Sequence, residues 1–231
     1  MLSSLKKSIK RMLNPVDLKS LNADSPVDEH MGFSRGTPID RYFIEKYLSD
    51  NSKKIQGNLL EVAEDKYIRQ FCTSIENSNF AILDFSSEVS TPPTKYNFDL
   101  EKPETCPEEE FDTFVCTNTL NFLYEVRAAI KSSHKILKPG GCFLGTVASY
   151  TQVSKFDYER WGDYWRFTDK SLKRLLEEEF KDVEIKVFGN FSTALGLMQG
   201  LSVEEIQDKS IFDSVDPTYA SVIGFKAIKG E

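Results

Sequence analysis

The sequence contains few of the residues that build metal sites and disulfide frameworks. It has four cysteines and two histidines among 231 residues, and no two cysteines have Cys-x-x-Cys spacing. Scattered cysteines of this kind are usually buried, reduced thiols. Neither histidine is spaced from the other, or from a cysteine, as metal ligands are. The sequence therefore predicts no metal site and no disulfide-stapled fold.

Long apolar runs and an excess of positive charge are also missing. No run approaches the roughly 20 apolar residues that a membrane-spanning helix requires. The net charge is −7, from 29 basic and 36 acidic residues, which disfavours general binding to nucleic acid because such binding needs a basic surface. The composition, 40% hydrophobic and 28% charged, is that of an ordinary globular protein, and we expect it in the cytoplasm.

The N-terminus has no apolar core or cleavage site of a secretory signal. Residues 1–13, MLSSLKKSIKRML, place Leu2, Leu5, Ile9 and Met12 on one helical face among four basic residues. That pattern fits peripheral contact with an anionic membrane, here at its inner face, or with a partner. A short helix that packs on its own domain is the simpler interpretation. We therefore divide the chain into a basic N-terminal helix with an irregular arm, 1–32, and one domain, 33–231.

Beyond this arm, helical and strand-like patterns alternate along the chain. Amphipathic periodicity predicts helices over 39–55, 121–137 and 169–180, and a short helix fits in 67–74. Strand-like runs occupy 58–62, 79–85, 96–100, 111–117, 142–147, 183–188 and 220–228. This alternation predicts an α/β fold in which a mostly parallel, doubly wound sheet is covered on both faces.

The segment FDTFVCTNTLNFLYEVRAAIKSSHKILKPGGCFLGTV, 111–147, resembles class I S-adenosylmethionine (SAM)-dependent methyltransferases, with a buried strand, a polar turn, a helix and a Leu-Lys-Pro-Gly-Gly corner. RGTPIDRYFIEKYL at 35–48, RWGDYWRFTDKSLKRLLEEEF at 160–180 and DPTYASVIGFKAIK near the end resemble a bacterial subgroup linked to glycan and polysaccharide synthesis. The resemblance implies a seven-stranded Rossmann-like sheet with its last strand antiparallel, SAM as cofactor, and a glycosyltransferase as a partner.

The turn after the first strand lacks the glycines that such folds usually carry there. It reads Glu61-Val62-Ala63-Glu64, whereas glycine would let the backbone approach the ligand closely. The subgroup that this chain resembles keeps one glycine where this chain has Ala63. We expect Ala63 to tolerate close approach if its φ is negative, and Glu61 to accept the ammonium group of SAM.

Further cofactor contacts are expected where the next strands end. Asp84 ends the second strand, 23 positions after Glu61, where a carboxylate can accept hydrogen bonds from both ribose hydroxyls. An acid that only caps a turn is the alternative. The resemblance implies that Asp99 lies beside the adenine amino group and that the turn after the fourth strand floors the pocket near the methyl group. The expected contacts are Val62, Phe85, Leu100, Thr117, Asn118 and Thr119.

Methyl transfer is an in-line displacement, in which a protein aligns the nucleophile and can supply a base for its proton. Asn121 stands where the resemblance predicts a histidine, and an amide cannot take up a proton, although it can bind substrate. The segment 155–167 offers Trp161 and Trp165, whose faces suit a saccharide ring, although two core tryptophans fit equally well. The candidate catalytic residues are Asn121, Tyr158, Asp163 and Arg166.

We therefore predict a SAM-dependent methyltransferase that acts on a small-molecule or saccharide-like acceptor at oxygen. The alternative is a methyltransferase-like domain that has lost turnover and serves as a binding or scaffolding subunit. Ala63 and Asn121 favour the alternative, whereas Asp84, Asp99 and Asn118 favour the enzyme. Fold by itself does not decide between them.

Overall fold

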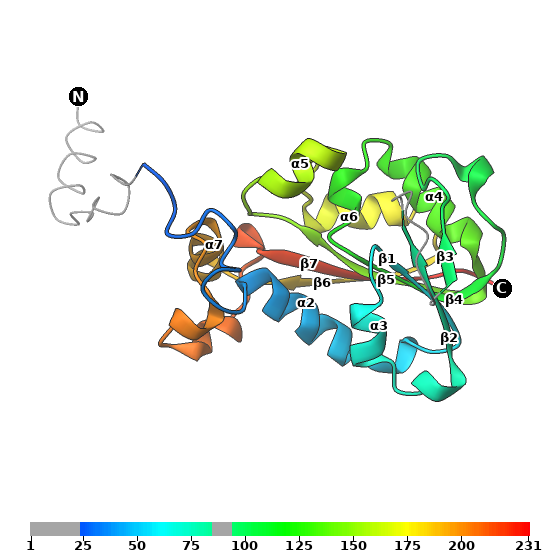
Figure 1. Cartoon of the computed structure of the whole chain (residues 1–231), viewed down its shortest axis with the longest axis horizontal. Coiled ribbons are helices and arrows are strands. Elements are labelled where there is room, and N and C mark those ends of the chain that lie inside the picture. The colour runs from blue at the N-terminus through cyan, green and yellow to red at the C-terminus, as the bar shows by residue number, and fades with distance from the viewer. Residues whose placement is uncertain (1–23, 85–93) are drawn as a thin grey trace, which may run out of the picture.

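The computed structural model describes residues 24–84 and 94–231 (Figure 1). The basic segment 1–13 and Phe85 lie outside the described residues. Within the described ranges, no helix combines the length and the apolar character needed to cross a membrane.

A seven-stranded sheet with the order β3-β2-β1-β4-β5-β7-β6 forms the centre of the fold. The first five strands pair in parallel, and β7 is antiparallel to both of its neighbours. The predicted doubly wound sheet with an antiparallel last strand is confirmed. The strands are β1 (Asn58–Val62), β2 (Asn79–Leu83), β3 (Thr94–Tyr96), β4 (Phe111–Thr117), β5 (Leu137–Ala148), β6 (Asp182–Phe188) and β7 (Val222–Ile228).

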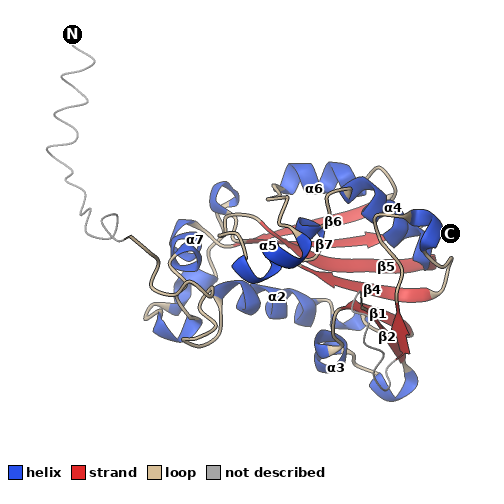
Figure 2. Cartoon of the chain, turned by 45° about the horizontal axis from the view of Figure 1, so that its top comes forward, coloured by secondary structure: helices blue, strands red, loops and turns tan. Residues whose placement is uncertain are grey.

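Helices cover both faces of this sheet. They are α2 (Ile39–Asp50), α3 (Lys66–Phe71), α4 (Val126–Ile136), α5 (Lys155–Trp161), α6 (Asp169–Leu176) and α7 (Phe191–Met198). Figure 2 shows α4 and α6 on one face, with α2 and α3 on the other. The central strands are therefore buried on both sides, which explains why they read as continuous apolar runs.

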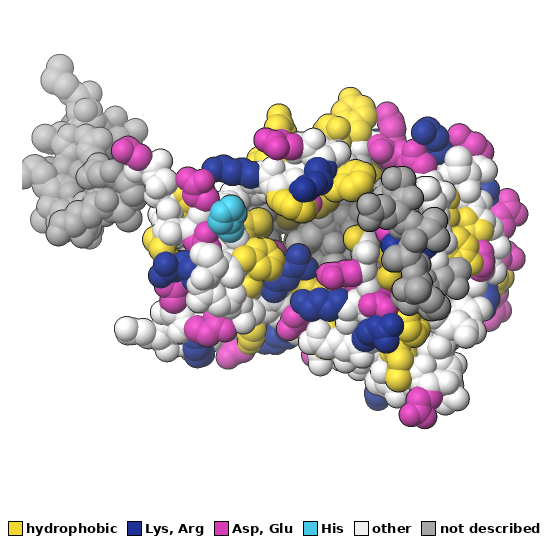
Figure 3. Space-filling view, viewed as in Figure 1, with side chains coloured by type: hydrophobic (Ala, Val, Ile, Leu, Met, Phe, Trp, Pro, Cys, Tyr) yellow, Lys and Arg dark blue, Asp and Glu magenta, His cyan; other side chains and the backbone are white. Residues whose placement is uncertain are grey.

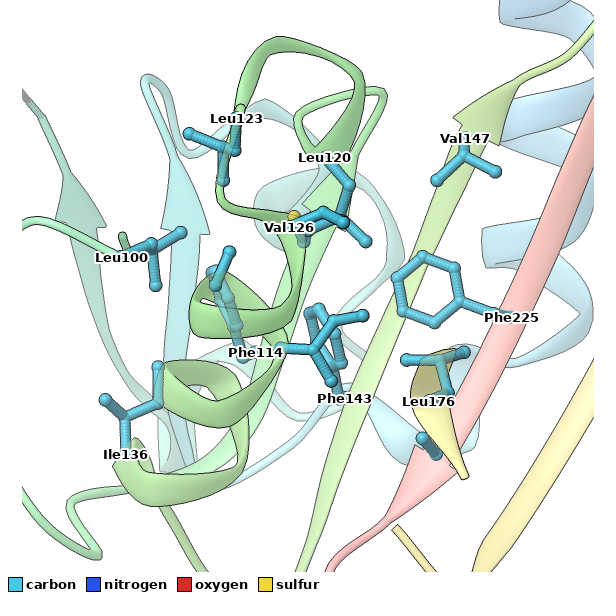
Figure 4. Close-up of a cluster of buried hydrophobic side chains, with 14 of the residues drawn as sticks. Leu100, Phe114, Leu120, Leu123, Val126, Ile136, Phe143, Val147, Leu176 and Phe225 are labelled. Carbon is cyan, nitrogen blue, oxygen red and sulfur yellow. The ribbon is translucent and has the colours of Figure 1, made fainter. Parts of the chain in front are cut away.

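Two buried clusters fill the spaces between these layers. Beneath α4 and α6, the rings of Phe114 and Phe143 stack with centroids 5.3 Å apart, and Phe225 packs edge-on against Phe143 (Figure 4). Beneath α2, Phe43 and Tyr47 pack against Phe188 at the end of β6. Because buried side chains along α2 pack on the sheet, the first turn of α2 is held in a fixed position relative to the strands.

The third strand lies earlier than the sequence predicts. It was expected over 96–100, but β3 ends at Tyr96. The Asp99 carboxylate accepts a hydrogen bond from the Glu101 N–H at 2.9 Å, and the Thr105 hydroxyl donates to the Asp99 carbonyl at 3.2 Å. These bonds turn the chain, so Asp99 stands in a loop beyond the strand.

The helices also depart from the prediction in places. The helix expected from 121 begins at Val126, because Leu120–Phe122 forms a separate 3₁₀ turn. The sequence did not predict α5 or α7, which are seven and eight residues long. Their starts are capped by the Ser154 and Asn190 side chains. By contrast, α6 begins at Asp169, where the sequence predicts a helix to start, and Thr168 caps it with a full capping box.

Candidate functional site

A cleft of about 820 Å³ opens where β1, β2 and β4 end. The strand order reverses between β1 and β4, and ligands of doubly wound folds bind at such a switch point. The surface is hollowed beside α5, with basic and acidic side chains around the hollow (Figure 3). The residues that line it come from the strand ends, the first turns of α2 and α3, the arm before α2, and the segment that contains α5.

Glu61 lies at the base of this cleft, and its side chain holds α3 in place. The residue is only 2% exposed, and its two carboxylate oxygens accept hydrogen bonds from the N–H groups of Tyr67 at 3.1 Å and Ile68 at 2.8 Å. Burial raises the pKa of Glu61 to about 7, against the opposing effect of these two bonds. Each oxygen retains a second lone pair, so Glu61 can still accept a hydrogen bond from a cationic ligand group.

Ala63 adopts the backbone conformation of a glycine. Its φ is +67°, so the condition of a negative φ is not met. The Glu64 N–H donates to the Val62 carbonyl at 2.9 Å, which makes Ala63 the centre of a three-residue turn, and the Ala63 N–H donates to Leu83 at 2.9 Å. Such turns with a positive central φ are rare and strained. The turn therefore keeps the backbone conformation that a glycine would adopt, although residue 63 is alanine, and the backbone there is strained.

A second positive φ occurs at Asn118, where φ is +49°. Asparagine tolerates this region better than most residues. The Asn118 N–H donates to the Thr146 carbonyl at 2.7 Å, and the Thr146 hydroxyl donates to the Asn118 Oδ1 at 3.2 Å. Together with its neighbours Thr117 and Thr119, Asn118 lines the cleft where β4 ends.

Of the residues expected near the ribose and adenine, Asp84 and Asp99 line the cleft and Leu100 does not. Asp84 lines the cleft and pairs with Lys95, with 2.6 Å between Oδ2 and Nζ. Asp99 also lines it, together with Asn97, which the sequence analysis did not select. Leu100 does not line the cleft: its side chain is fully buried in the core beside α4 (Figure 4). Asp84 and Asp99 thus bring two carboxylates to one end of the cleft.

Asn121 lines the cleft, but its amide is engaged by the backbone. The residue is 1% exposed, its Nδ2 donates to the Trp165 carbonyl at 2.6 Å, and its Oδ1 accepts from the Ala148 N–H at 3.0 Å. Its own carbonyl accepts from the N–H of Tyr164 at 2.8 Å. These hydrogen bonds connect the end of β5 to the segment after α5, so Asn121 has a structural role.

Arg166 and Asp163 form a similar fastening. The guanidinium makes a two-pronged ion pair with Asp163 and donates to the carbonyls of Gln152 at 2.7 Å and Trp165 at 2.9 Å. The Asp163 side chain is 2% exposed and also accepts from the Ser154 N–H at 3.2 Å. Both residues line the cleft, but their side chains are engaged in the ion pair and in these hydrogen bonds. They stabilise the wall of the cleft.

Tyr158, the fourth candidate catalytic residue, does not line the cleft. Tyr158 is 59% exposed. Trp161, from the last turn of the same helix, does line it.

The first turn of α2 brings two charged residues into the cleft that sequence analysis did not select, Asp40 and Arg41. The Arg41 Nη1 donates to the Tyr67 hydroxyl at 2.8 Å, and no carboxylate in the described ranges forms an ion pair with it. Asp40 is 5% exposed, and a main-chain N–H, that of Arg41 at 2.8 Å, donates to its carboxylate. Burial raises the pKa of Asp40, while the Arg41 charge opposes this. An acid in the first turn of a helix is ordinary, so the sequence carried no distinctive signal.

Solved structures with this fold include several methyltransferases. The CurJ carbon methyltransferase is 12% identical, with 83% of this chain and 55% of that chain covered and a TM-score of 0.54. A Haloferax volcanii methyltransferase in complex with the activator Trm112 is 10% identical, with 83% and 92% covered and a TM-score of 0.53. A Haemonchus contortus N-methyltransferase with bound S-adenosylhomocysteine is 12% identical, with 84% and 58% covered and a TM-score of 0.51. This chain thus spans little more than half of two of the three.

A search of curated protein sequences gives no match. The sheet order, the antiparallel β7 and the cleft at the switch point define a Rossmann-like methyltransferase fold. Residues 56–145 match the family model described as a methyltransferase domain. Over these residues the chain is similar to methyltransferase domains.

Proposed function

We propose that this protein transfers a methyl group from SAM to an oxygen of a saccharide-like acceptor. The observation that carries the proposal is the distribution of charge along the cleft. Carboxylates stand where β1, β2 and β3 end, and a guanidinium without an ion-paired carboxylate in the described ranges stands opposite them in α2. SAM, when bound, supplies an electrophilic methyl group on a sulfonium.

The charged groups fit the two ends of this cofactor. Arg41 donates to a carboxylate, and Glu61 accepts from an ammonium group, which are the two charges of an amino acid. Asp84 and Asp99 offer acceptors for hydroxyl and amino groups at the other end. These four residues would hold the ligand by both ends, and Ala63 lies in the turn between β1 and α3.

The acceptor side is the part of the cleft beneath α5. Phe33, Phe156 and Trp161 line it, and each is between 49% and 67% exposed. Exposed aromatic rings next to polar groups suit a ligand with apolar faces and polar edges, which a sugar ring has. The polar groups at this part of the wall include Gln152 and Lys155. This composition supports a saccharide-like acceptor.

An oxygen nucleophile benefits from a base, and Asp40 is the carboxylate best suited to that task. The cleft-lining acids Glu61, Asp84 and Asp163 each have two backbone donors or a cationic partner. Within the described residues, Asp40 accepts hydrogen bonds only from main-chain N–H groups of its own turn, and burial raises its pKa, which makes a carboxylate a stronger proton acceptor near neutral pH. We assign the acceptor's proton to Asp40.

The resemblance to proteins of glycan synthesis supports three further proposals: a glycosyltransferase as a partner, a cytoplasmic site of action and contact with the inner face of the membrane. Each concerns the surroundings of the enzyme, and none is needed for the chemistry of the cleft.

Calorimetric titration with SAM and S-adenosylhomocysteine tests the cofactor part of this proposal. We expect micromolar binding of both, and a weaker affinity, by about 1–3 kcal/mol, for Asp84→Ala, which loses a charged hydrogen-bond acceptor. A screen of sugar and glycolipid acceptors with methyl-labelled SAM then tests the reaction, with Trp161→Ala expected to raise KM. A folded protein that binds neither ligand at millimolar concentration would contradict the proposal and favour a binding or scaffolding subunit.

A further inference from the structure

The helix α7 is apolar on both of its faces, although only one of them packs on the domain. Ala194 and Leu197 are buried, whereas Phe191, Leu195 and Met198 are 57%, 46% and 55% exposed. The exposed three lie at positions i, i+4 and i+7, which is one face of a helix. The sequence of this helix, FSTALGLM, contains no charged residue. A helix that is apolar all round is normally covered all round.

The exposed face continues beyond α7 through aromatic contacts. The ring of Tyr219 lies edge-on to Phe191 with centroids 5.3 Å apart, and Tyr150 lies 6.3 Å from Tyr219. Both tyrosines are partly exposed, at 38% and 52%. We call Tyr150, Phe191, Leu195, Met198 and Tyr219 the α7 patch. Contiguous apolar patches of this kind mark interaction sites.

The N-terminal part of the chain reaches the domain beside this patch. The Asp28 N–H donates to the carbonyl of Gln199 at 3.1 Å, one residue after α7. Gly200 packs so closely that a Cβ there would lie 2.1 Å from the Asp28 carbonyl oxygen. In Figure 1 the chain before α2 passes α7. The described chain therefore passes the end of α7, a helix whose exposed face nothing in residues 24–84 and 94–231 covers.

The distance allows residues 2–12 to return to α7. About 15 residues separate position 13 from Asp28, and a chain of that length reaches at most about 50 Å when fully extended. A helix of eight residues is about 12 Å long. The apolar residues Leu2, Leu5, Ile9 and Met12 are spaced to form one helical stripe, which would match the length of the patch.

The charges favour this segment over a membrane as the occupant. Residues 199–219 contain five acidic residues and one lysine, whereas residues 1–13 contain four basic residues and no acid. Arg35 pairs with Glu205 and Lys46 with Asp213. The other three, Glu204, Asp208 and Asp216, have no cationic partner within the described part of the chain. We call these five acids, in the segment that follows α7, the acidic border. They would repel an anionic lipid surface and attract a basic segment.

We propose that residues 2–12 dock as an amphipathic segment on the α7 patch of their own chain. Their apolar stripe covers Phe191, Leu195 and Met198, and their basic residues face the acidic border. Tyr150 immediately precedes Thr151 and Gln152, which line the cleft, so the docked segment lies beside the cleft mouth.

Photo-crosslinking in the full chain tests the docking. A benzoylphenylalanine placed at Leu5 should crosslink to residues 191–198 or 219 of the same chain, as judged with mixed isotope-labelled protein, whereas the same probe at Lys7, on the opposite face of the helix, should not. Leu195→Glu should reduce the yield at least tenfold. Val153→Glu is the matched control, because Val153 is equally exposed, at 50%, but lies outside the patch, and the yield should stay within twofold.

Hydrogen exchange gives an independent readout. The amides of α7 should exchange at least fivefold faster in the Leu5→Glu/Ile9→Glu chain than in the wild type, with β5 unchanged. Crosslinks only between chains would overturn the proposal in favour of a dimer contact. Crosslinks absent in solution, together with vesicle binding that depends on residues 1–13, would overturn it in favour of membrane contact.

Discussion

The strained turn at Ala63 predicts that this position is more stable as glycine. With φ at +67°, an L-residue other than glycine pays about 1–2 kcal/mol for the left-handed conformation. Glycine avoids this cost but loses more backbone entropy on folding, worth about 0.4–1 kcal/mol. We therefore expect Ala63→Gly to raise the free energy of unfolding by about 0.5–1 kcal/mol.

The turn cannot relieve this strain by relaxing to a negative φ. The hydrogen bonds from the Ala63 N–H to Leu83 and from the Glu64 N–H to Val62, both 2.9 Å long, fix the backbone on either side. A change in φ would break the second of them and would move the start of α3. Ala63→Val should accordingly be destabilising, because a β-branched side chain is a worse occupant of this region.

Denaturant unfolding of the two variants against a matched control checks this reasoning. Ala128→Gly makes the same chemical change inside α4, where φ is negative and glycine is expected to cost about 1 kcal/mol. For a domain of this size, the stabilised variant should melt about 1–4 °C higher. If Ala63→Gly proves as destabilising as Ala128→Gly, the strain that we infer from the turn does not exist.

Three further predictions concern the cleft. The affinity for SAM should rise between about pH 5 and pH 7 and stay constant above that. The pKa of Glu61 is about 7, so below pH 7 the ammonium group of the ligand must displace a proton from this carboxyl group. Calorimetry in buffers of different ionisation enthalpy should show proton release on binding to the wild type and no proton release on binding to Glu61→Gln. Asp40→Asn should lower the methyl-transfer rate by about 10²–10⁴-fold while its affinity for SAM stays within twofold of the wild type. The wild-type rate should rise with pH as the Asp40 carboxyl, whose pKa is raised, loses its proton. A loss of SAM binding in the variant would instead make Asp40 a cofactor ligand. Asn121→Ala should lower the free energy of unfolding by about 2–4 kcal/mol, because it leaves two buried backbone groups unpaired; unchanged stability with a raised acceptor KM would make Asn121 a substrate contact.

The fold was readable from the sequence because its signals are local and repeated. Six of the seven predicted strands formed close to their expected positions, and β3 formed slightly earlier. A buried parallel strand can be recognised from its apolar run alone, without knowledge of its neighbours. The short helices α5 and α7 escaped for the converse reason. Their starts depend on single caps, Ser154 and Asn190, and one or two turns give too little periodicity to detect.

The site was less readable, because the role of a polar residue depends on its partners. Asp163 and Arg166 were selected for their chemistry, but the structure pairs them with each other and with backbone groups. Asp40 looked like an ordinary first-turn acid until the fold buried it. The positive φ of Ala63 could not be predicted from the sequence either, because hydrogen bonds to the carbonyl groups of Leu83 and Val62 impose it.

These partnerships also bear on whether Ala63 and Asn121 are compatible with the proposed methyl transfer. Asn121 fastens Ala148 to Trp165, and Arg166 fastens Gln152 to Asp163, so both residues make the wall beneath α5 rigid. Methyl transfer depends chiefly on holding the nucleophile in line with the methyl group, and a rigid wall serves that need without a proton acceptor at position 121. If Asp40 is the base, as we propose, an asparagine at position 121, where the resemblance predicts a histidine, is compatible with turnover.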